Sequence, residues 1–154
     1  MKKKSIPYKE TEYVGRSSRP FDEYNDCAVR ALMTVTGASY DDAQHYLSLH
    51  CDRRRGRGVN TNRLRERLGL NPFLPKTILG ASFKLIPTGA GRRLNPRKRR
   101  ECPTLKMFLA DRSKGRYYCL MRGHAFAVID GVVVDEFPLG ARCRVDTCWE
   151  VITQ

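Results

Sequence analysis

Apolar residues recur at helical spacing in the first half of the chain. The segment that starts at Cys27, CAVRALMTVT, places Val29, Leu32 and Met33 on one side of a helix. Gly37 follows this segment, and glycine is common just after a helix end because it readily adopts the left-handed backbone conformation. We therefore predict a first helix that begins at Cys27 and ends before Gly37.

Two further helices are predicted after the first one. Ser39, followed three residues later by Asp42, is similar to a capping box, and the segment YDDAQHYLSLHC behind it carries its apolar residues on one face. The shorter segment NTNRLRERLG fits a third helix, capped by Asn60, Thr61 or Asn62. These segments predict a mainly helical first half of the domain.

The second half of the chain changes to short apolar and aromatic runs that are typical of strands. The predicted strands cover residues 83–87, 116–121, 124–130, 132–137 and, near the end, 142–152. Between the third and fourth runs, Asp130-Gly131 is the strongest short signal for a two-residue hairpin turn. One more helix is predicted behind Thr104, and Trp149 is expected to anchor the last strand in the core. Helices first and a small antiparallel sheet after them predict an α+β fold.

The length of 154 residues, with 41% hydrophobic and 29% charged residues, suits one domain with its own core. This composition excludes collagen-like, disordered and coiled-coil proteins. We expect residues 1–20 to form a basic N-terminal arm and residues 21–154 to form a single domain. The N-terminus lacks the apolar run of a signal peptide, and no later stretch is apolar enough to span a membrane. We therefore expect a cytoplasmic protein without a membrane partner, whose six cysteines are reduced thiols.

The net charge of the chain is large, +13, and is unevenly distributed along the sequence. Residues 2–9, 53–67 and 92–100 hold 17 basic side chains and one acidic side chain, whereas the rest of the chain carries −3. Such concentrated charge indicates an anionic partner such as a nucleic acid, or else loops that only add solubility. The candidate polyanion-binding residues lie in predicted basic loops at 53–58 and 87–101. They are Arg53, Arg54, Arg55, Arg57, Arg92, Arg93, Arg97, Lys98, Arg99 and Arg100.

Cys27 is the first candidate for chemistry. It follows Asn25 and Asp26, either of which can cap the helix, and it opens the first predicted helix. Unpaired backbone N–H groups and the helix dipole favour a thiolate at that position. A nucleophilic cysteine also needs a base that is near in space, and the chain has three histidines. Two of them lie within the second predicted helix, whereas His124 opens a strand.

The hairpin register selects an acidic partner for His124. With the predicted two-residue turn, Ile129 pairs with Val132, so His124 and Asp135 share one face of the sheet in diagonal positions. Diagonal positions lie about 7 to 8 Å apart at Cα, which lets a carboxylate reach an imidazole. Asp130 lies on the same strand as His124 but about 20 Å away, at about 3.3 Å per residue, and is excluded.

We assign no catalytic or metal-binding role to four other polar residues of the first two predicted helices. His45, His50 and Cys51 are close in sequence, but they lack the CxxC or HxxxH spacing of a zinc site, so neither a metal nor a cofactor is predicted. Arg30 lies one turn after Asp26, and we interpret the two as an i,i+4 ion pair that holds the helix start.

Two blocks of the sequence resemble papain-like cysteine peptidases, especially the short type often encoded by bacteriophages. They are DCAVRAL at the first predicted helix and KGRYYCLMRGHAFAVIDGVVVDE near the end. The first block is also similar to the D-x-x-C-x-x-R-A block of ovarian-tumour-type deubiquitinases. The resemblance covers residues 21–137, with a cysteine-bearing helix before the sheet, as in that family. It implies a papain-like fold with Cys27 as nucleophile, His124 as general base and acid, and Asp135 as the residue that orients the imidazole.

The chain departs from the family pattern just before the cysteine. Many papain-like enzymes have a glutamine about six residues before the nucleophile, where it helps to form the oxyanion hole. Here positions 21 to 23 are Phe, Asp and Glu. The resemblance therefore implies an oxyanion hole made by the backbone N–H of Cys27 and the side chain of Asn25.

The leading hypothesis is a cysteine-nucleophile hydrolase that cleaves a peptide or isopeptide bond of a protein or peptide substrate through a thioester intermediate. An amidase or acyltransferase would use the same three residues and differ only in the acyl acceptor. A non-catalytic basic module that binds nucleic acid or a ribonucleoprotein on a papain-like scaffold stays open, because fold does not choose between these functions. The enzyme would depend on Cys27 and His124, whereas the binding module would depend on the basic residues at 53–57 and 92–100.

Overall fold

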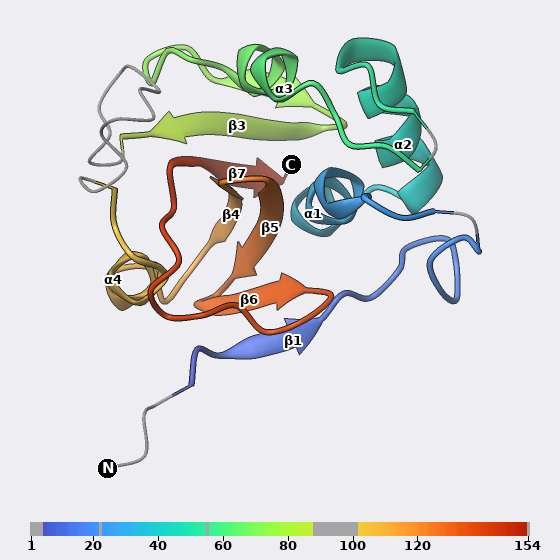
Figure 1. Cartoon of the computed structure of the whole chain (residues 1–154). Coiled ribbons are helices and arrows are strands. Elements are labelled where there is room, and N and C mark those ends of the chain that lie inside the picture. Colours follow the sequence, from blue (N-terminus) through green and yellow to red (C-terminus); the bar gives the residue numbers. More distant parts are fainter. Residues whose placement is uncertain (1–4, 22, 55, 88–101, 154) are drawn as a thin grey trace.

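The computed structural model describes residues 5–21, 23–54, 56–87 and 102–153. These residues form an α+β fold, which confirms the predicted class (Figure 1). Their elements are, in chain order, β1 (Tyr8–Glu10), α1 (Cys27–Thr36), α2 (Tyr40–His50), α3 (Thr61–Leu68), β2 (Lys76–Ile78), β3 (Ala81–Ile86), α4 (Leu105–Ala110), β4 (Arg116–Met121), β5 (His124–Ile129), β6 (Val132–Asp135) and β7 (Thr147–Thr153). Because β1 comes before the helices and α4 lies between β3 and β4, the predicted order of helices first and strands afterwards holds only in part.

One sheet contains all seven strands of the described residues, in the order β1-β6-β5-β4-β7-β3-β2. Neighbouring strands are antiparallel except β1 and β6, which run parallel. Ile129 pairs with Val132 across Asp130 and Gly131, and both turn residues have the positive φ that a type I′ turn requires. The predicted register between β5 and β6 is therefore confirmed.

The helix caps follow the sequence signals with one exception. The side chains of Ser39, Asn60 and Thr104 each accept a hydrogen bond from the backbone three residues ahead, at the starts of α2, α3 and α4. Gly37 ends α1 in the left-handed conformation, with φ of 76°. The exception is Asp26 before α1, whose carboxylate makes no capping hydrogen bond to that helix. Its oxygens accept hydrogen bonds from side chains instead.

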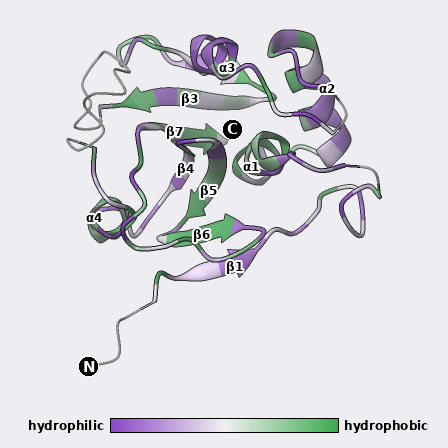
Figure 2. Ribbon diagram, viewed as in Figure 1, coloured by the Kyte–Doolittle hydropathy of each residue, from purple (hydrophilic) through white to green (hydrophobic). Residues whose placement is uncertain are grey.

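Side chains pack on both faces of the sheet, and the alternation along β5 separates the two faces. Ala125 and Ala127 belong to the larger core cluster with α1, whereas Phe126 and Val128 belong to a second cluster with α4. Figure 2 shows the hydrophobic residues along β5 and β7. Because the two alanine side chains are short, α1 can lie close to β5, and its first turn comes within reach of the start of that strand.

The N-terminal segment differs from the expected arm, because Tyr8–Glu10 form β1 at the edge of the sheet. The backbone N–H of Thr11 donates to the carbonyl oxygen of Asp135 at 3.0 Å, and the Tyr8 hydroxyl donates to that of Glu136 at 2.8 Å. This part of the predicted arm is therefore built into the domain, where it holds the end of β6. A three-residue strand has too few positions to show an alternating pattern, which explains why it was not predicted.

The remaining differences concern boundaries. The predicted strand at 83–87 begins two residues earlier, as β3, and forms a hairpin with the unpredicted β2. The helix behind Thr104 is short, and β7 begins five residues after the expected start at 142. The predicted basic loop at 87–101 lies outside the described residues except for Pro87.

Trp149 of β7 anchors the core as predicted, because it is fully buried and its Nε1 atom donates to the carbonyl oxygen of Gly69 at 2.8 Å. Trp149→Phe would leave that carbonyl without its donor and create a void. We expect the free energy of unfolding to fall by about 2 to 4 kcal/mol. Urea unfolding followed by circular dichroism measures this change. Ile152→Thr, at a 58% exposed side chain of the same strand, is the control and should change it by less than about 0.5 kcal/mol. Equal losses in the two variants would contradict the anchoring role.

Candidate active site

His124 and Asp135 meet across the hairpin of β5 and β6. His124 is the first residue of β5 and follows Gly123, whose φ of 69° closes the turn from β4. Asp135 is the last residue of β6 and is buried. The Nε2 atom of His124 lies 2.5 Å from Oδ2 of Asp135, so the structure brings together the two side chains that the register selects. Asp130 lies at the far end of the strand, where its carboxylate accepts a hydrogen bond from the backbone N–H of Gly115.

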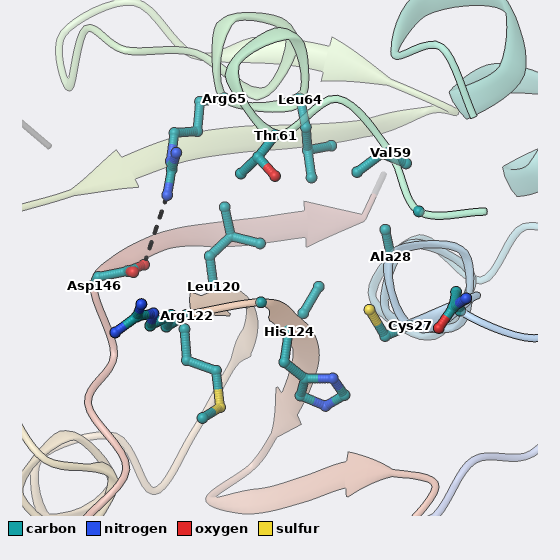
Figure 3. A pocket seen from close by; sticks show the side chains of 15 residues that line it. Cys27, Ala28, Val59, Thr61, Leu64, Arg65, Leu120, Arg122, His124 and Asp146 are labelled. Atoms are coloured by element: carbon teal, nitrogen blue, oxygen red, sulfur yellow. Dashed lines mark ion pairs between the residues drawn. The ribbon is translucent and has the colours of Figure 1, made fainter. Parts of the chain in front are cut away.

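Cys27 is the first residue of α1, and its sulfur lies next to the ring of His124 (Figure 3). The imidazole of His124 and the backbone N–H of Ala125 both stabilise the thiolate form of this sulfur. Because the Nε2 atom of His124 is engaged with Asp135, Nδ1 is the ring nitrogen available to the sulfur. The thiol, the imidazole and the carboxylate therefore form one series, in which the imidazole is hydrogen bonded to the carboxylate and acts on the thiol.

The surroundings of this series favour a thiolate beside an imidazolium. Burial raises the pKa of the Cys27 thiol, but the hydrogen bonds from His124 and from the Ala125 N–H bring that pKa below its ordinary value of 9.0. Burial lowers the pKa of His124, but hydrogen bonds to Asp135 and Cys27 raise it from 6.5 to about 9. Burial also raises the pKa of Asp135, but the hydrogen bond and charge of His124 bring it below its ordinary value. At neutral pH the imidazole is thus protonated and the carboxylate is ionised.

A cavity of about 390 Å³ opens beside the sulfur and the imidazole. Its apolar wall consists of Ala28, Val59, Leu64 and Leu120 (Figure 3). Across the cavity from Cys27, Arg65 of α3 and Asp146 form an ion pair whose nitrogen and oxygen are 4.0 Å apart. Arg122, from the turn between β4 and β5, also lines the cavity. A substrate would therefore meet an apolar surface near the sulfur and charged groups farther away.

Arg30 contacts both Asp26, which precedes Cys27, and Asp135, which contacts His124. Only the first of these contacts is predicted from the sequence. Its Nε atom lies 3.0 Å from Oδ1 of Asp26, which is the predicted i,i+4 ion pair. Its Nη1 atom lies 3.0 Å from Oδ1 of Asp135, and its Nη2 atom lies 3.4 Å from Oε2 of Glu136. An arginine within the otherwise apolar segment CAVRALM is the signal that could have indicated these contacts, because a buried guanidinium requires acidic partners.

Asn25, the predicted oxyanion-hole side chain, lines the cavity. Its backbone is left-handed, with φ of 55°, and its Nδ2 atom donates to the carbonyl oxygen of Gly56 at 3.3 Å. The amide nitrogen carries two hydrogens. One of them therefore binds the carbonyl oxygen of Gly56, and the second can donate to a substrate oxygen.

The predicted polyanion-binding residues lie in different environments. Arg53 is buried, and its Nη2 atom lies 2.5 Å from Oε2 of Glu23, so its prediction as a surface contact is wrong. The buried carboxylate of Glu23 requires a cation, and Arg53 supplies it. Arg54 and Arg57 are exposed. The other candidates lie outside the described residues: Arg55, Arg92, Arg93, Arg97, Lys98, Arg99 and Arg100.

The other cysteines differ from Cys27 in their surroundings. Cys51 is buried, and this burial raises its pKa to about 11. Cys119 and Cys148 face each other from β4 and β7 with their sulfurs 3.9 Å apart, and burial raises the pKa of Cys119. Within the described ranges, no group of three or more His, Cys, Asp or Glu side chains could hold a metal ion.

No protein-family model, curated protein or solved structure matches this chain. Arguments about its function therefore depend on its own residues. None of the helices in the described part of the chain is long and apolar enough to cross a membrane.

We expect Cys27 to react fastest among the six thiols near neutral pH. Its alkylation by limiting iodoacetamide should rise with pH through a midpoint below 9.0, because the thiolate is the reactive form. His124→Ala removes the imidazolium and should move this midpoint upward. The rate at neutral pH then falls about ten-fold for each pH unit of that movement. Peptide mass spectrometry measures each site, with Cys51 as the internal control. Equal rates at Cys27 and Cys51 would contradict the assignment.

Substitutions of Arg53 and of its exposed neighbours should have different effects. If Arg54 and Arg57 meet phosphates, replacing both with serine should flatten the slope of log K against log salt on duplex DNA by up to about two, without loss of stability. Arg53→Ser removes the guanidinium from the buried carboxylate of Glu23, and we expect it to lower the free energy of unfolding by about 3 to 5 kcal/mol. Fluorescence anisotropy at several salt concentrations and urea unfolding measure the two effects. An unchanged slope would exclude Arg54 and Arg57 as phosphate contacts.

Proposed function

We propose that this chain is a papain-like cysteine hydrolase that cleaves a peptide or isopeptide bond. The observation that carries the proposal is the series of Cys27, His124 and Asp135 beside one cavity. The arrangement of the elements also supports it, because the helix with the cysteine packs on the strand that begins with the histidine. The acidic partner comes from the same sheet as the histidine, as the resemblance to papain-like peptidases implies.

The proposed reaction has two steps. The Cys27 thiolate attacks the carbonyl carbon and a C–S bond forms; His124 then gives its proton to the leaving nitrogen as the C–N bond breaks. Next, neutral His124 takes a proton from water, the water oxygen bonds to the thioester carbon, and the C–S bond breaks. These events release the acid and restore the thiolate and the imidazolium. Asp135 orients the imidazole and stabilises its charge in both steps.

The negative oxygen of the tetrahedral intermediate needs donors close to the sulfur. The Asp26 carboxylate accepts hydrogen bonds from Arg30 and Tyr40 rather than capping α1, so it leaves the first-turn backbone N–H groups to another acceptor. We assign the oxyanion hole to the backbone N–H of Cys27 and the second amide hydrogen of Asn25. This pair takes the place of the glutamine that the family pattern has and this chain lacks.

The acyl-transfer chemistry can be tested with p-nitrophenyl acetate, a small activated ester that needs little substrate recognition. We expect a burst of nitrophenolate and an acetyl group on Cys27, both detected in the wild-type protein by absorbance and mass spectrometry. Cys27→Ala should abolish both signals, and His124→Ala should slow acetylation about 10²- to 10⁴-fold. Asp135→Asn should slow it less than His124→Ala, because an amide oxygen can still accept a hydrogen bond from the ring.

Cys143→Ala is the matched control for this experiment, because Cys143 is a partly exposed thiol outside the cavity lining. It should leave the burst unchanged. Acetylation spread over several cysteines, or acetylation that is insensitive to His124→Ala, would rule out the proposed nucleophile and base.

The acyl acceptor decides between hydrolase and transferase. Unfolded casein offers many peptide bonds, and new carboxyl termini that depend on Cys27 would support hydrolysis. Glycine ethyl ester added as a competing amine provides the alternative acceptor. Products that carry this amine, at a rate above that of the free acid, would assign an acyltransferase instead.

A further inference from the structure

We propose that Arg30 is a positioning residue of the candidate active site. Its guanidinium holds Asp26 and Asp135 together, and thereby fixes the start of α1 against the end of β6. Arg30 does not line the cavity, so it acts through these carboxylates rather than on the substrate. The inference rests on the proposed function, because it concerns the same nucleophile and base.

The contacts of Arg30 connect the nucleophile with the base in a short series. Asp26 directly precedes Cys27, and its Oδ1 atom lies 3.0 Å from Nε of Arg30. Nη1 of the same guanidinium lies 3.0 Å from Oδ1 of Asp135, whose other oxygen holds His124. A guanidinium is planar and rigid, so the positions of these two carboxylates depend on each other. The distance between the sulfur and the imidazole therefore depends on Arg30.

Each carboxylate has a further partner that restricts its rotation. The Tyr40 hydroxyl donates to Oδ2 of Asp26 at 2.8 Å, and the backbone N–H of Glu136 donates to Oδ1 of Asp135 at 2.7 Å. Arg19 also bridges the same two segments, because it forms ion pairs with Asp26 and Glu136. The Arg30 guanidinium therefore contacts two carboxylates whose orientations are already restricted.

Burial explains why arginine is needed at this position. Arg30 is 5% exposed, and Asp26 and Asp135 are 0% and 2% exposed, so water cannot replace a lost contact easily. Lysine would keep the positive charge, but its ammonium is a point charge on a flexible chain and has no rigid fork. We therefore expect Arg30→Lys to keep a positive charge beside the two carboxylates but to hold them less firmly in position.

The charged and titratable groups that face Arg30 come from several parts of the fold. They are Asp26 before α1, Tyr40 of α2, Asp135 at the end of β6, Glu136 directly after it, and Tyr8, Tyr13 and Arg19 of the N-terminal segment. If Asp135 is held less firmly, its hydrogen bond to His124 weakens and the pKa of the imidazole falls. Less imidazolium then lies beside the sulfur, so the pKa of Cys27 rises. The expected direction is therefore an upward shift of the thiolate midpoint.

The test measures alkylation of Cys27 as a function of pH in folded wild-type protein and in Arg30→Lys. We expect the midpoint to rise by about one pH unit in Arg30→Lys, so the rate at neutral pH falls about ten-fold. Arg53→Lys is the matched control, because it alters another buried ion pair of an arginine and a carboxylate, Arg53–Glu23, which does not contact the three site residues. It should leave the midpoint unchanged.

A second background separates a positioning role from a direct effect of the Arg30 charge. In Asp135→Asn, the contact through which Arg30 acts is already altered, so adding Arg30→Lys should shift the midpoint less than in the wild type. If the midpoint of Arg30→Lys equals that of the wild type, or if the shift is the same in both backgrounds, the proposal is overturned.

Should Arg30→Lys fail to fold, the double variant Arg30→Gln/Asp26→Asn removes the connection without leaving an unpaired charge on Asp26. Its midpoint should exceed that of Asp26→Asn alone, and equality of the two would overturn the proposal. Failure of the proposed function looks different, because wild-type Cys27 would then react no faster than Cys51. A reactive wild-type Cys27 with an unshifted Arg30→Lys midpoint would refute only the positioning role.

Discussion

The carboxylate of Asp135 is almost completely removed from water, and an ionised carboxylate in such a position is stable only when cations and donors surround it. His124 contacts one of its oxygens and Arg30 contacts the other. Because Arg30 also pairs with Asp26, the same requirement holds the start of α1 at the end of β6. The position of Cys27 relative to the imidazole thus follows from the need to neutralise one buried acid.

Local signals explain why part of the candidate site could be predicted from the sequence. The Asp130-Gly131 turn sets the register of its hairpin, and the register alone puts Asp135 beside His124. The helix that begins at Cys27 follows in the same way from its apolar spacing and from the glycine at its end. These features depend on neighbours within a few residues, so composition and spacing are enough to predict them.

Contacts between residues far apart in the sequence could not be predicted from local patterns. The i,i+4 partner of Arg30 could be predicted, but its second partner, Asp135, lies 105 residues further along the chain. Likewise, Arg53 has the same arginine-rich neighbourhood as Arg54, and only the fold shows that it is buried against Glu23. The parallel pairing of β1 is also long-range, which is why the N-terminal segment was expected to be an arm.

The place of β7 in the sheet affects when the cleft can form. β7 follows β6 in the chain but lies between β4 and β3 in the sheet. Of the strands on one flank of β7, β5 and β6 carry His124 and Asp135. The strands on its other flank, β3 and β2, contact α3, which supplies Leu64 and Arg65 to the cavity. Pairings between strands far apart in sequence form slowly, because long loops must close first. A chain in which β7 has not yet paired with β4 and β3 therefore has Cys27 and His124 but not the complete cleft between them and α3.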